Sequence, residues 1–323
     1  MTRDVQRVAL EEHFIDPRQD SYFRELAGDA ALRHPGLRSA LSKLADTDGS
    51  RIEEMNRLGI EIAVLSYFNG SGVQNDSDAV RATIKASEMN DFLARRIDAH
   101  PARFRGWGAM AMQDPVGANV EFRRCVTELG FLGAMINGHT HGRYLDEPEF
   151  LPFWETAAEL DVPIYLHPSD SPPERMAAYR DFPQLTKAAW DWSVETAYHA
   201  LRIICSGIFD RFPTVTLILG HMGELLPYHL SRFDQTTSHG RQDTAMPISH
   251  YIRHNVMITT SGNVSPATLL AAQMEMGADR IMFATDYPLG LAEQFTTTVE
   301  NCPMSDADKQ KIFHLNARKL LRL

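Results

Sequence analysis

Residues 8–14 read VALEEHF, an apolar run that ends in two carboxylates and an imidazole. Such a run is typical of a buried parallel strand, which is apolar because both faces of its sheet are covered. A doubly wound nucleotide-binding sheet would continue with a Gly-rich phosphate loop, and no such loop follows Leu10. The stretch therefore favours a closed barrel over an open doubly wound sheet.

Apolar runs of strand length recur along the chain, with helix-like segments between them. The predicted strands are 8–10, 62–66, 104–111, 131–136, 163–166, 215–219, 256–260 and 281–284. The predicted helices are 48–58, 76–99, 115–129, 149–160, 193–209, 265–276 and 306–320. Alternation of this kind within 323 residues predicts an α/β protein with a (β/α)8 TIM-like barrel.

We expect one barrel domain over residues 1–323, with two insertions. The segments 14–46 and 168–192 are longer than a barrel requires, and they follow the first and the fifth predicted strand. Loops at the carboxyl ends of barrel strands surround the pocket, so both insertions are expected at its mouth.

Composition excludes several classes of protein. The chain has 32 basic and 42 acidic residues, a net charge of −10, which argues against a nucleic-acid partner. No apolar stretch approaches the ~20 residues that span a bilayer, so we expect no membrane partner and a cytoplasmic location. The 3 cysteines lie far apart, so a metal would need histidine nitrogens and carboxylate oxygens.

Ionisable side chains end four of the predicted strands. Glu11 and His13 share one face of the first strand, because strand side chains alternate. His167 follows the fifth strand, His221 the sixth and Asp286 the eighth. Each could be a packed or solvated residue by itself. Because the strands of a barrel end at one rim, we expect the group to converge there.

Four of these residues form a plausible ligand set for one divalent metal ion. They offer two imidazole nitrogens and two carboxylate oxygens, from Glu11, His13, His167 and Asp286. Zinc is the expected ion, with manganese and magnesium as alternatives, since such sets accept several metals.

The motifs around these residues resemble the metal-dependent amidohydrolase superfamily, and within it the non-oxidative hydroxybenzoate decarboxylases of the gamma-resorcylate and 2,3-dihydroxybenzoate type. They are ALEEHF at 9–14, YLHP at 165–168, LGHMGE at 219–224 and ATDYP at 284–288. Hydrolytic members typically carry His-x-His on the first strand, whereas this chain has Glu11-x-His13, as in the decarboxylase branch. The resemblance spans almost the whole chain.

The resemblance implies a homodimer or homotetramer with one divalent ion, held by the four residues named above. It also implies that His221, Glu224 and Asp286 form the acid/base group. The implied reaction releases CO2 from an ortho-hydroxylated, dihydroxybenzoate-like aromatic acid and leaves a phenol, and it can be reversible. Asp286 is the candidate proton donor, and His221, oriented by Glu224, the proton relay.

Four further residues are candidates for binding the aromatic substrate: Arg232, Tyr67, His139 and Trp190. Three of them have an alternative interpretation. Arg232 could instead form a surface ion pair with Asp234, His139 could belong to a solvated loop, and Trp190 could be a core residue.

Two other functions stay open at this level. A metal-dependent hydrolase of a lactone or amide could use the same barrel, and a non-catalytic barrel could bind a ligand. Glu11-x-His13 favours the decarboxylase over the hydrolase, and a non-catalytic barrel leaves the converging ionisable groups unexplained.

Overall fold

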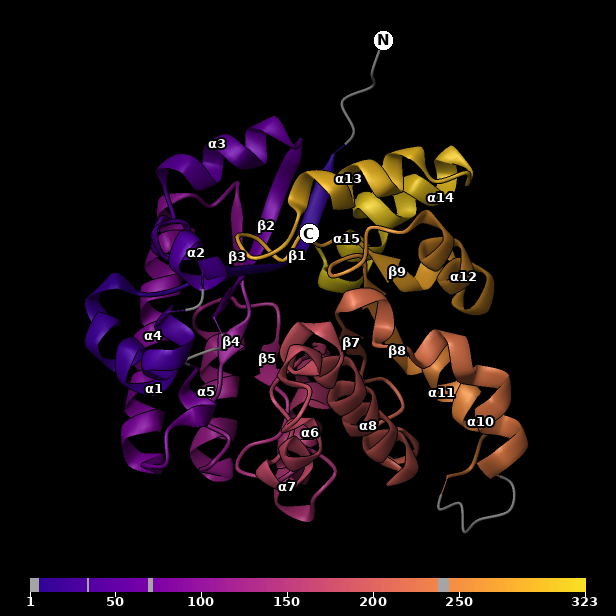
Figure 1. Cartoon of the computed structure of the whole chain (residues 1–323), viewed down its shortest axis with the longest axis horizontal. Coiled ribbons are helices and arrows are strands. Elements are labelled where there is room, and N and C mark those ends of the chain that lie inside the picture. The colour runs from indigo at the N-terminus through magenta and orange to yellow at the C-terminus, as the bar shows by residue number, and fades with distance from the viewer. Residues whose placement is uncertain (1–5, 34, 69–71, 238–243) are drawn as a thin grey trace.

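Strands and helices alternate along the chain in its computed structural model, which describes residues 6–33, 35–68, 72–237 and 244–323 (Figure 1). The strands are β1 Arg7–Phe14, β2 Ile60–Tyr67, β3 Phe104–Gly106, β4 Gly108–Ala109, β5 Ala134–Asn137, β6 Ile164–His167, β7 Leu217–Leu219, β8 Val256–Thr259 and β9 Ile281–Met282.

The helices lie outside the strands (Figure 1). They are α1 Asp20–Arg33, α2 Pro35–Ala45, α3 Gly49–Arg57, α4 Ala79–Ala99, α5 Pro115–Thr127, α6 Leu151–Leu160, α7 Pro173–Met176, α8 Asp191–Cys205, α9 Ile208–Arg211, α10 Leu230–Thr237, α11 Ile248–Asn255, α12 Pro266–Met276, α13 Ala292–Asn301, α14 Asp306–Gln310 and α15 Asn316–Leu321.

The strands close into a barrel. All strand pairs are parallel, in the orders β1-β2-β3 and β4-β5-β6-β7-β8-β9. Only Trp107 separates β3 from β4, so the two occupy one strand position, the first half pairing with β2 and the second with β5. The Leu10 N–H donates to the Phe283 carbonyl at 3.1 Å, which joins the last strand to the first. The predicted (β/α)8 barrel is confirmed.

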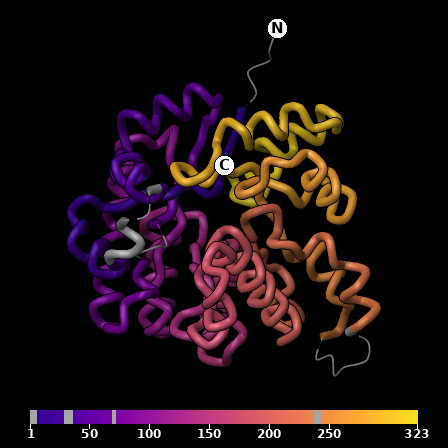
Figure 2. The backbone as a smooth tube through the Cα atoms, in the orientation of Figure 1, coloured from indigo at the N-terminus to yellow at the C-terminus, as the bar shows by residue number. Residues whose placement is uncertain are grey.

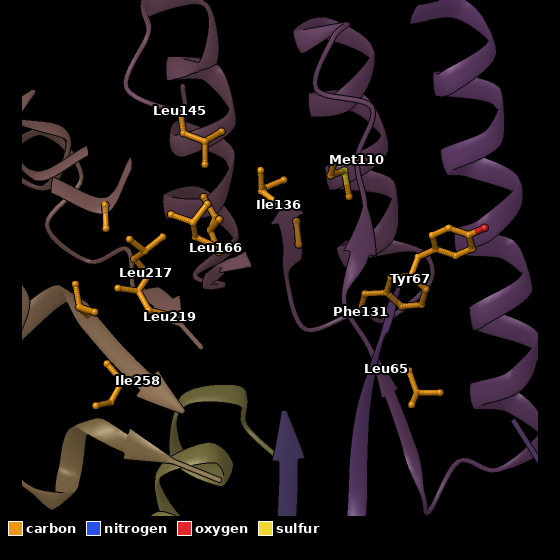
Figure 3. Packing of buried hydrophobic residues seen from close by; sticks show 14 of the residues in the cluster. Leu65, Tyr67, Met110, Phe131, Ile136, Leu145, Leu166, Leu217, Leu219 and Ile258 are labelled. Atoms are coloured by element: carbon orange, nitrogen blue, oxygen red, sulfur yellow. The ribbon is translucent and has the colours of Figure 1, made fainter. Parts of the chain in front are cut away.

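The chain passes once around the molecule (Figure 2), and its last helix, α15, packs against its first strand, β1. Side chains of alternate strand residues fill the barrel interior: Val8, Leu10, Ile62, Val64, Trp107, Met135, Tyr165, Ile218, Met257 and Met282. The intervening residues, among them Leu65, Ile136, Leu166 and Leu219, pack against the helices (Figure 3). Burial on both faces explains why the strands read as continuous apolar runs.

Some helices differ from the sequence prediction. The predicted helix 193–209 is two helices, α8 and α9, divided at Gly207, whose φ of 79° lies in the left-handed region that ends helices. The predicted helix 306–320 contains a π-helical turn at Lys311–Leu315 between α14 and α15. Six helices have no counterpart in the sequence prediction: α1, α2, α7, α10, α11 and α13.

Both predicted insertion segments follow strands at the same end of the barrel. Residues 14–46 contain α1 and α2; residue 34 of this segment lies outside the described residues. Residues 168–192 contain α7 and short 3-10 turns. Asp191, at the start of α8, accepts a hydrogen bond from Ser171 Oγ at 2.7 Å, and Trp192 Nε1 donates to Asp170 at 2.6 Å. These bonds join the two ends of the second segment to each other.

In the ranges that the structure describes, no helix is both long and apolar enough to cross a bilayer.

Candidate functional site

Four side chains from three strand ends meet at the carboxyl rim of the barrel. Each of Glu11, His13, His167 and Asp286 offers one ligand atom, and these atoms all lie within 4.8 Å of one another. His13 Nε2 is 3.1 Å from Asp286 Oδ1, and His167 Nε2 is 3.2 Å from Glu11 Oε1. Three of the residues are buried, whereas the Asp286 side chain is 19% exposed, so the cluster opens to solvent on the Asp286 side.

The cluster fits a divalent cation. Glu11 Oε1 and His13 Nε2 are buried and have no hydrogen-bond partner among the residues that the structure describes, although both face the other ligand atoms. Burying a polar atom without a partner costs about 1–3 kcal/mol, so such atoms need a ligand to account for them. Two carboxylates and two neutral imidazoles would balance the charge of one divalent ion. The residues present therefore suit a single metal site.

Hydroxyl groups fix the Glu11 carboxylate. Its Oε2 accepts hydrogen bonds from Tyr165 Oη at 2.6 Å, Ser261 Oγ at 2.5 Å and Thr259 Oγ1 at 3.3 Å. With Oε2 held in this way, Oε1 is left facing the histidines. A Cβ at Gly220 would lie 2.9 Å from Oε2, so a glycine is required for this close approach.

The two imidazole ligands are oriented by their other ring nitrogens. His167 Nδ1 lies 3.0 Å from the Pro168 carbonyl, which can only accept, so Nδ1 carries the proton and Nε2 keeps its lone pair for a metal. Burial also lowers the pKa of His167, which favours this neutral form. His13 Nδ1 lies 2.9 Å from Ser66 Oγ.

A second histidine–carboxylate pair adjoins the ligands. His221 Nδ1 is 2.6 Å from Glu224 Oε1, and its Nε2 is 3.3 Å from Glu11 Oε1. Burial lowers the pKa of His221, but the carboxylates of Glu11 and Glu224 outweigh burial and raise that pKa to about 10. His221 and Glu224 both have φ of 49°, and the Ser261 hydroxyl holds the His221 backbone N–H at 3.0 Å.

Tyr67 lies away from the cluster. Ser66 faces His13, so the next residue of β2, Tyr67, faces the helices (Figure 3). Its ring packs against that of Phe14, with the two ring centroids 5.7 Å apart. Burial raises the pKa of its hydroxyl. The ring that does adjoin the site is Phe68, whose centroid is 6.1 Å from that of His13. The period of two along β2 is the sequence signal that distinguishes Tyr67 from Phe68.

Within the described ranges, the other three substrate-binding candidates form no hydrogen bond, ion pair or ring contact with the four ligands. Arg232 is exposed on α10, and its expected alternative partner, Asp234, instead accepts hydrogen bonds from Ser249. His139 uses both ring nitrogens, accepting from Gly142 N–H at 3.0 Å and donating to the Asp170 carbonyl at 3.1 Å.

Trp190 precedes α8 and is 47% exposed. It lies in the 168–192 segment, at the rim that carries the metal ligands.

Several residues that support the site were not predicted. Tyr165, Ser66, Thr259 and Ser261 supply the hydroxyls that orient Glu11 and His13. Tyr165 stands two residues before His167 on β6 and so shares its face, a signal that was available in the sequence. Thr259 is the last residue of β8 and Ser261 follows that strand, which ends without an ionisable residue, so only the fold shows that the two hydroxyls reach Glu11.

The sequence of this chain is similar to those of known metal-dependent enzymes of one family. A family model described as amidohydrolase matches residues 45–323. The chain is 40% identical over 328 residues to the gamma-resorcylate decarboxylase of Polaromonas sp. strain JS666, covering 98% of each.

Solved structures show the same likeness. A 2,6-dihydroxybenzoate decarboxylase complexed with 2,6-dihydroxybenzoate superposes with a TM-score of 0.92 at 37% identity, over 98% of this chain and 99% of the other. A dihydroxybenzoic acid decarboxylase from Polaromonas sp. JS666, with bound manganese and the inhibitor 2-nitroresorcinol, also gives a TM-score of 0.92, at 39% identity over 98% and 97%.

Proposed function

The chain belongs to the amidohydrolase family, and from that premise we propose that it is a metal-dependent carboxy-lyase that removes CO2 from an ortho-hydroxylated aromatic acid without oxidation. The observation that carries the proposal is the buried cluster of Glu11, His13, His167 and Asp286, with two ligand atoms that have no hydrogen-bond partner. Full-length likeness to decarboxylases of dihydroxybenzoic acids supports the reaction type.

The proposed substrate is 2,6-dihydroxybenzoate, which carries a hydroxyl on each side of its carboxylate. The name of the Polaromonas relative and the ligand of the solved relative support this choice. Phe68, beside His13, offers an apolar surface for the ring.

Manganese is the proposed metal. The sequence alone favours zinc, but the ligand set accepts zinc and manganese alike. The manganese bound in the Polaromonas structure supports manganese. Glu11, His13, His167 and Asp286 would hold the ion, which would supply Lewis-acid stabilisation of the negative charge that develops on the substrate.

In the proposed mechanism, Asp286 gives a proton to the ring carbon that bears the carboxylate. Its side chain is the most exposed of the four ligands and so faces the space open to substrate. The carbon–carbon bond then breaks, its electron pair returns to the ring, and CO2 leaves. His221, held by Glu224 at 2.6 Å, is the group proposed to return a proton to Asp286.

The test is an assay of the purified protein with Mn²⁺ against 2,6-dihydroxybenzoate, 2,3-dihydroxybenzoate and salicylate. We expect CO2 and resorcinol from the first acid, with matching loss of its ultraviolet absorbance. The control is Glu11→Gln, which keeps the side-chain shape and removes one ligand charge. Hydrolysis of lactones or amides without CO2 release from any hydroxybenzoate would overturn the proposal.

We also propose that the chain is one barrel domain, with 14–46 and 168–192 as its insertions, and that it forms a homodimer or homotetramer. Exposed branched side chains on two adjacent helices, Val80 and Ile84 on α4 and Val116 and Val120 on α5, support association. Light scattering of the purified protein measures its mass in solution.

A further inference from the structure

Arg51 is a buried cation behind the metal cluster. It lies on α3 and is 1% exposed. Its guanidinium donates to the backbone carbonyls of His13 at 2.5 Å, Asp46 at 3.0 Å and Lys43 at 3.3 Å. Among the described residues no carboxylate lies within 4.0 Å of it, and a buried charge without such a partner is costly. The three carbonyls that stabilise this charge come from β1, from the C-terminal end of α2 and from the residue after α2, so Arg51 joins α3 to both elements.

The guanidinium also contacts the segment after β9, which carries the fourth ligand, Asp286. Its Cζ lies 4.7 Å from the ring centroid of Tyr287, the residue directly after Asp286. Arg51 therefore touches the backbone of one ligand, His13, and the immediate neighbour of another, Asp286.

Glu12 also connects β1 to the segment that carries Asp286. It alternates with Glu11 and His13, so it faces away from the ligands and is buried. Its carboxylate accepts hydrogen bonds from Thr285 N–H at 3.0 Å and from Thr285 Oγ1 at 2.7 Å. Glu12, Arg51, Thr285 and Tyr287 line one small cavity behind the cluster.

The contacts of Arg51 and the hydrogen bonds of Glu12 join two segments that are distant in sequence. Asp286 follows β9 at the end of the barrel, and its segment meets β1 through the His13 N–H bond to the Tyr287 carbonyl at 2.7 Å. Between these segments lie the two ligand atoms that are 3.1 Å apart, His13 Nε2 and Asp286 Oδ1. Their separation depends on how the two segments are held.

We propose that Glu12, Arg51 and Thr285, which we name the rear clamp, are positioning residues that set the spacing of His13 and Asp286 for the metal. This inference rests on the metal site of the proposed function. Partners in the outer shell of a metal site typically change affinity by about 10–100-fold when replaced.

The test measures Mn²⁺ affinity in Arg51→Lys. A lysine has one ammonium group and cannot bridge three carbonyls and a ring as the planar guanidinium does. Titration of Mn²⁺, with free ion quantified by electron paramagnetic resonance, is expected to give a Kd at least tenfold weaker than wild type. The spectrum of the bound ion is expected to change, because it reports ligand geometry independently of activity.

The matched control is Arg57→Lys, the same change on the same helix at an exposed arginine that pairs with Glu54. It is expected to leave Kd and spectrum unchanged. Should Arg51→Lys fail to fold, Thr285→Val decides, since it removes only the hydroxyl that bonds to Glu12. Its control is Thr296→Val, which removes a buried hydroxyl that bonds within α13.

Wild-type Kd and spectrum in Arg51→Lys and Thr285→Val would overturn the rear clamp, even if the apo proteins melt at lower temperature, because that outcome describes a structural role only. A wild-type protein that binds no Mn²⁺ would overturn the proposed function and the clamp together. If the wild-type protein binds Mn²⁺ and the variants show the same Kd and the same spectrum, only the rear clamp is overturned.

Discussion

The two oxygens of Glu11 have different environments within one carboxylate. Oε2 accepts three hydroxyl hydrogen bonds, whereas Oε1 has none and faces His167 and His221 at 3.2 and 3.3 Å. A histidine here, as in hydrolytic relatives, could not accept the three hydroxyls, because an imidazole offers one lone pair. The surrounding hydroxyls therefore match a glutamate, and the first-strand motif depends on residues of β6 and of the segment after β8.

Asp286→Asn tests the proposed proton donor. Asparagine keeps the shape and an oxygen for the metal but has no acidic proton, so kcat is expected to fall by about 10²–10⁴-fold. Turnover is measured at saturating Mn²⁺, with metal content determined on the same sample. Asp279→Asn, an exposed aspartate paired with Lys311, is the control. Activity above a tenth of wild type in fully loaded Asp286→Asn would remove Asp286 from this role.

Gly262→Ala tests the placement of His221. A Cβ at Gly262 would lie 2.4 Å from His221 Cδ2, so the imidazole must move, and a shift of about 1 Å can lower a rate by about 10²-fold. Gly130→Ala has the same type of backbone, φ 69° against 71°, but its Cβ would meet nothing within 4 Å. We expect lower kcat with Mn²⁺ retained for the first, and only lower stability for the second. Equal kcat in the two variants would contradict a role for His221.

At the level of elements, strands were easier to predict than helices. Each strand is covered on both faces, so its apolar run is visible in sequence, as at 217–219 and 256–259. The helix α13 was missed because its sequence, AEQFTTTVEN, contains three threonines, which are poor helix formers; burial of Phe295 and Val299 forms it instead.

Site residues on strands were also easier to predict than site residues on loops and helices. Glu11, His13, His167 and Asp286 could be named from strand ends alone, because the barrel fixes where strand ends meet. Residues that lie on loops or on covering helices, such as Arg51, could not, since their position depends on packing between elements rather than on a period along one of them.

The helix α8 carries a buried histidine that predicts a pH effect on stability. Burial of His199, with His139 and Arg202 nearby, lowers its pKa to about 3, and its Nε2 accepts the Leu145 N–H at 2.9 Å. In the unfolded chain a histidine titrates near ~6.5. Between these values unfolding takes up a proton, so the free energy of unfolding falls as the pH falls, by about 1.4 kcal/mol per unit.

His199→Gln removes this proton uptake while keeping an acceptor for Leu145. From pH 7 to pH 5 we expect wild type to lose about 2 kcal/mol more stability than the variant, measured by urea unfolding. His254→Gln, a change at an exposed histidine of α11, serves as the control and is expected to follow wild type. Parallel losses in wild type and His199→Gln would show that His199 is not protonated on unfolding.

In the whole molecule, the two ends of the barrel have different roles: one end holds the metal ligands, and the other holds ion pairs that stabilise the fold. The metal ligands lie where strands end, whereas Glu61, at the start of β2, pairs with Arg318 of α15 at 2.6 Å. A bound ion stabilises only the folded state, by about 2.7 kcal/mol at one hundred times its Kd. Scaled to a chain of 323 residues, this predicts an increase in Tm of about 4 °C with Mn²⁺ over the EDTA-treated protein.

Two glutamine substitutions, one at each end of the barrel, distinguish metal binding from stabilisation of the fold. Glu11→Gln removes a ligand charge, so the Mn²⁺-dependent rise in Tm is expected to disappear, while Glu61→Gln is expected to lower Tm slightly and to keep the full rise. Differential scanning calorimetry with and without Mn²⁺ measures both. An undiminished rise in Glu11→Gln would mean that the ion binds elsewhere, because the neutral amide cannot replace the carboxylate that balances its charge.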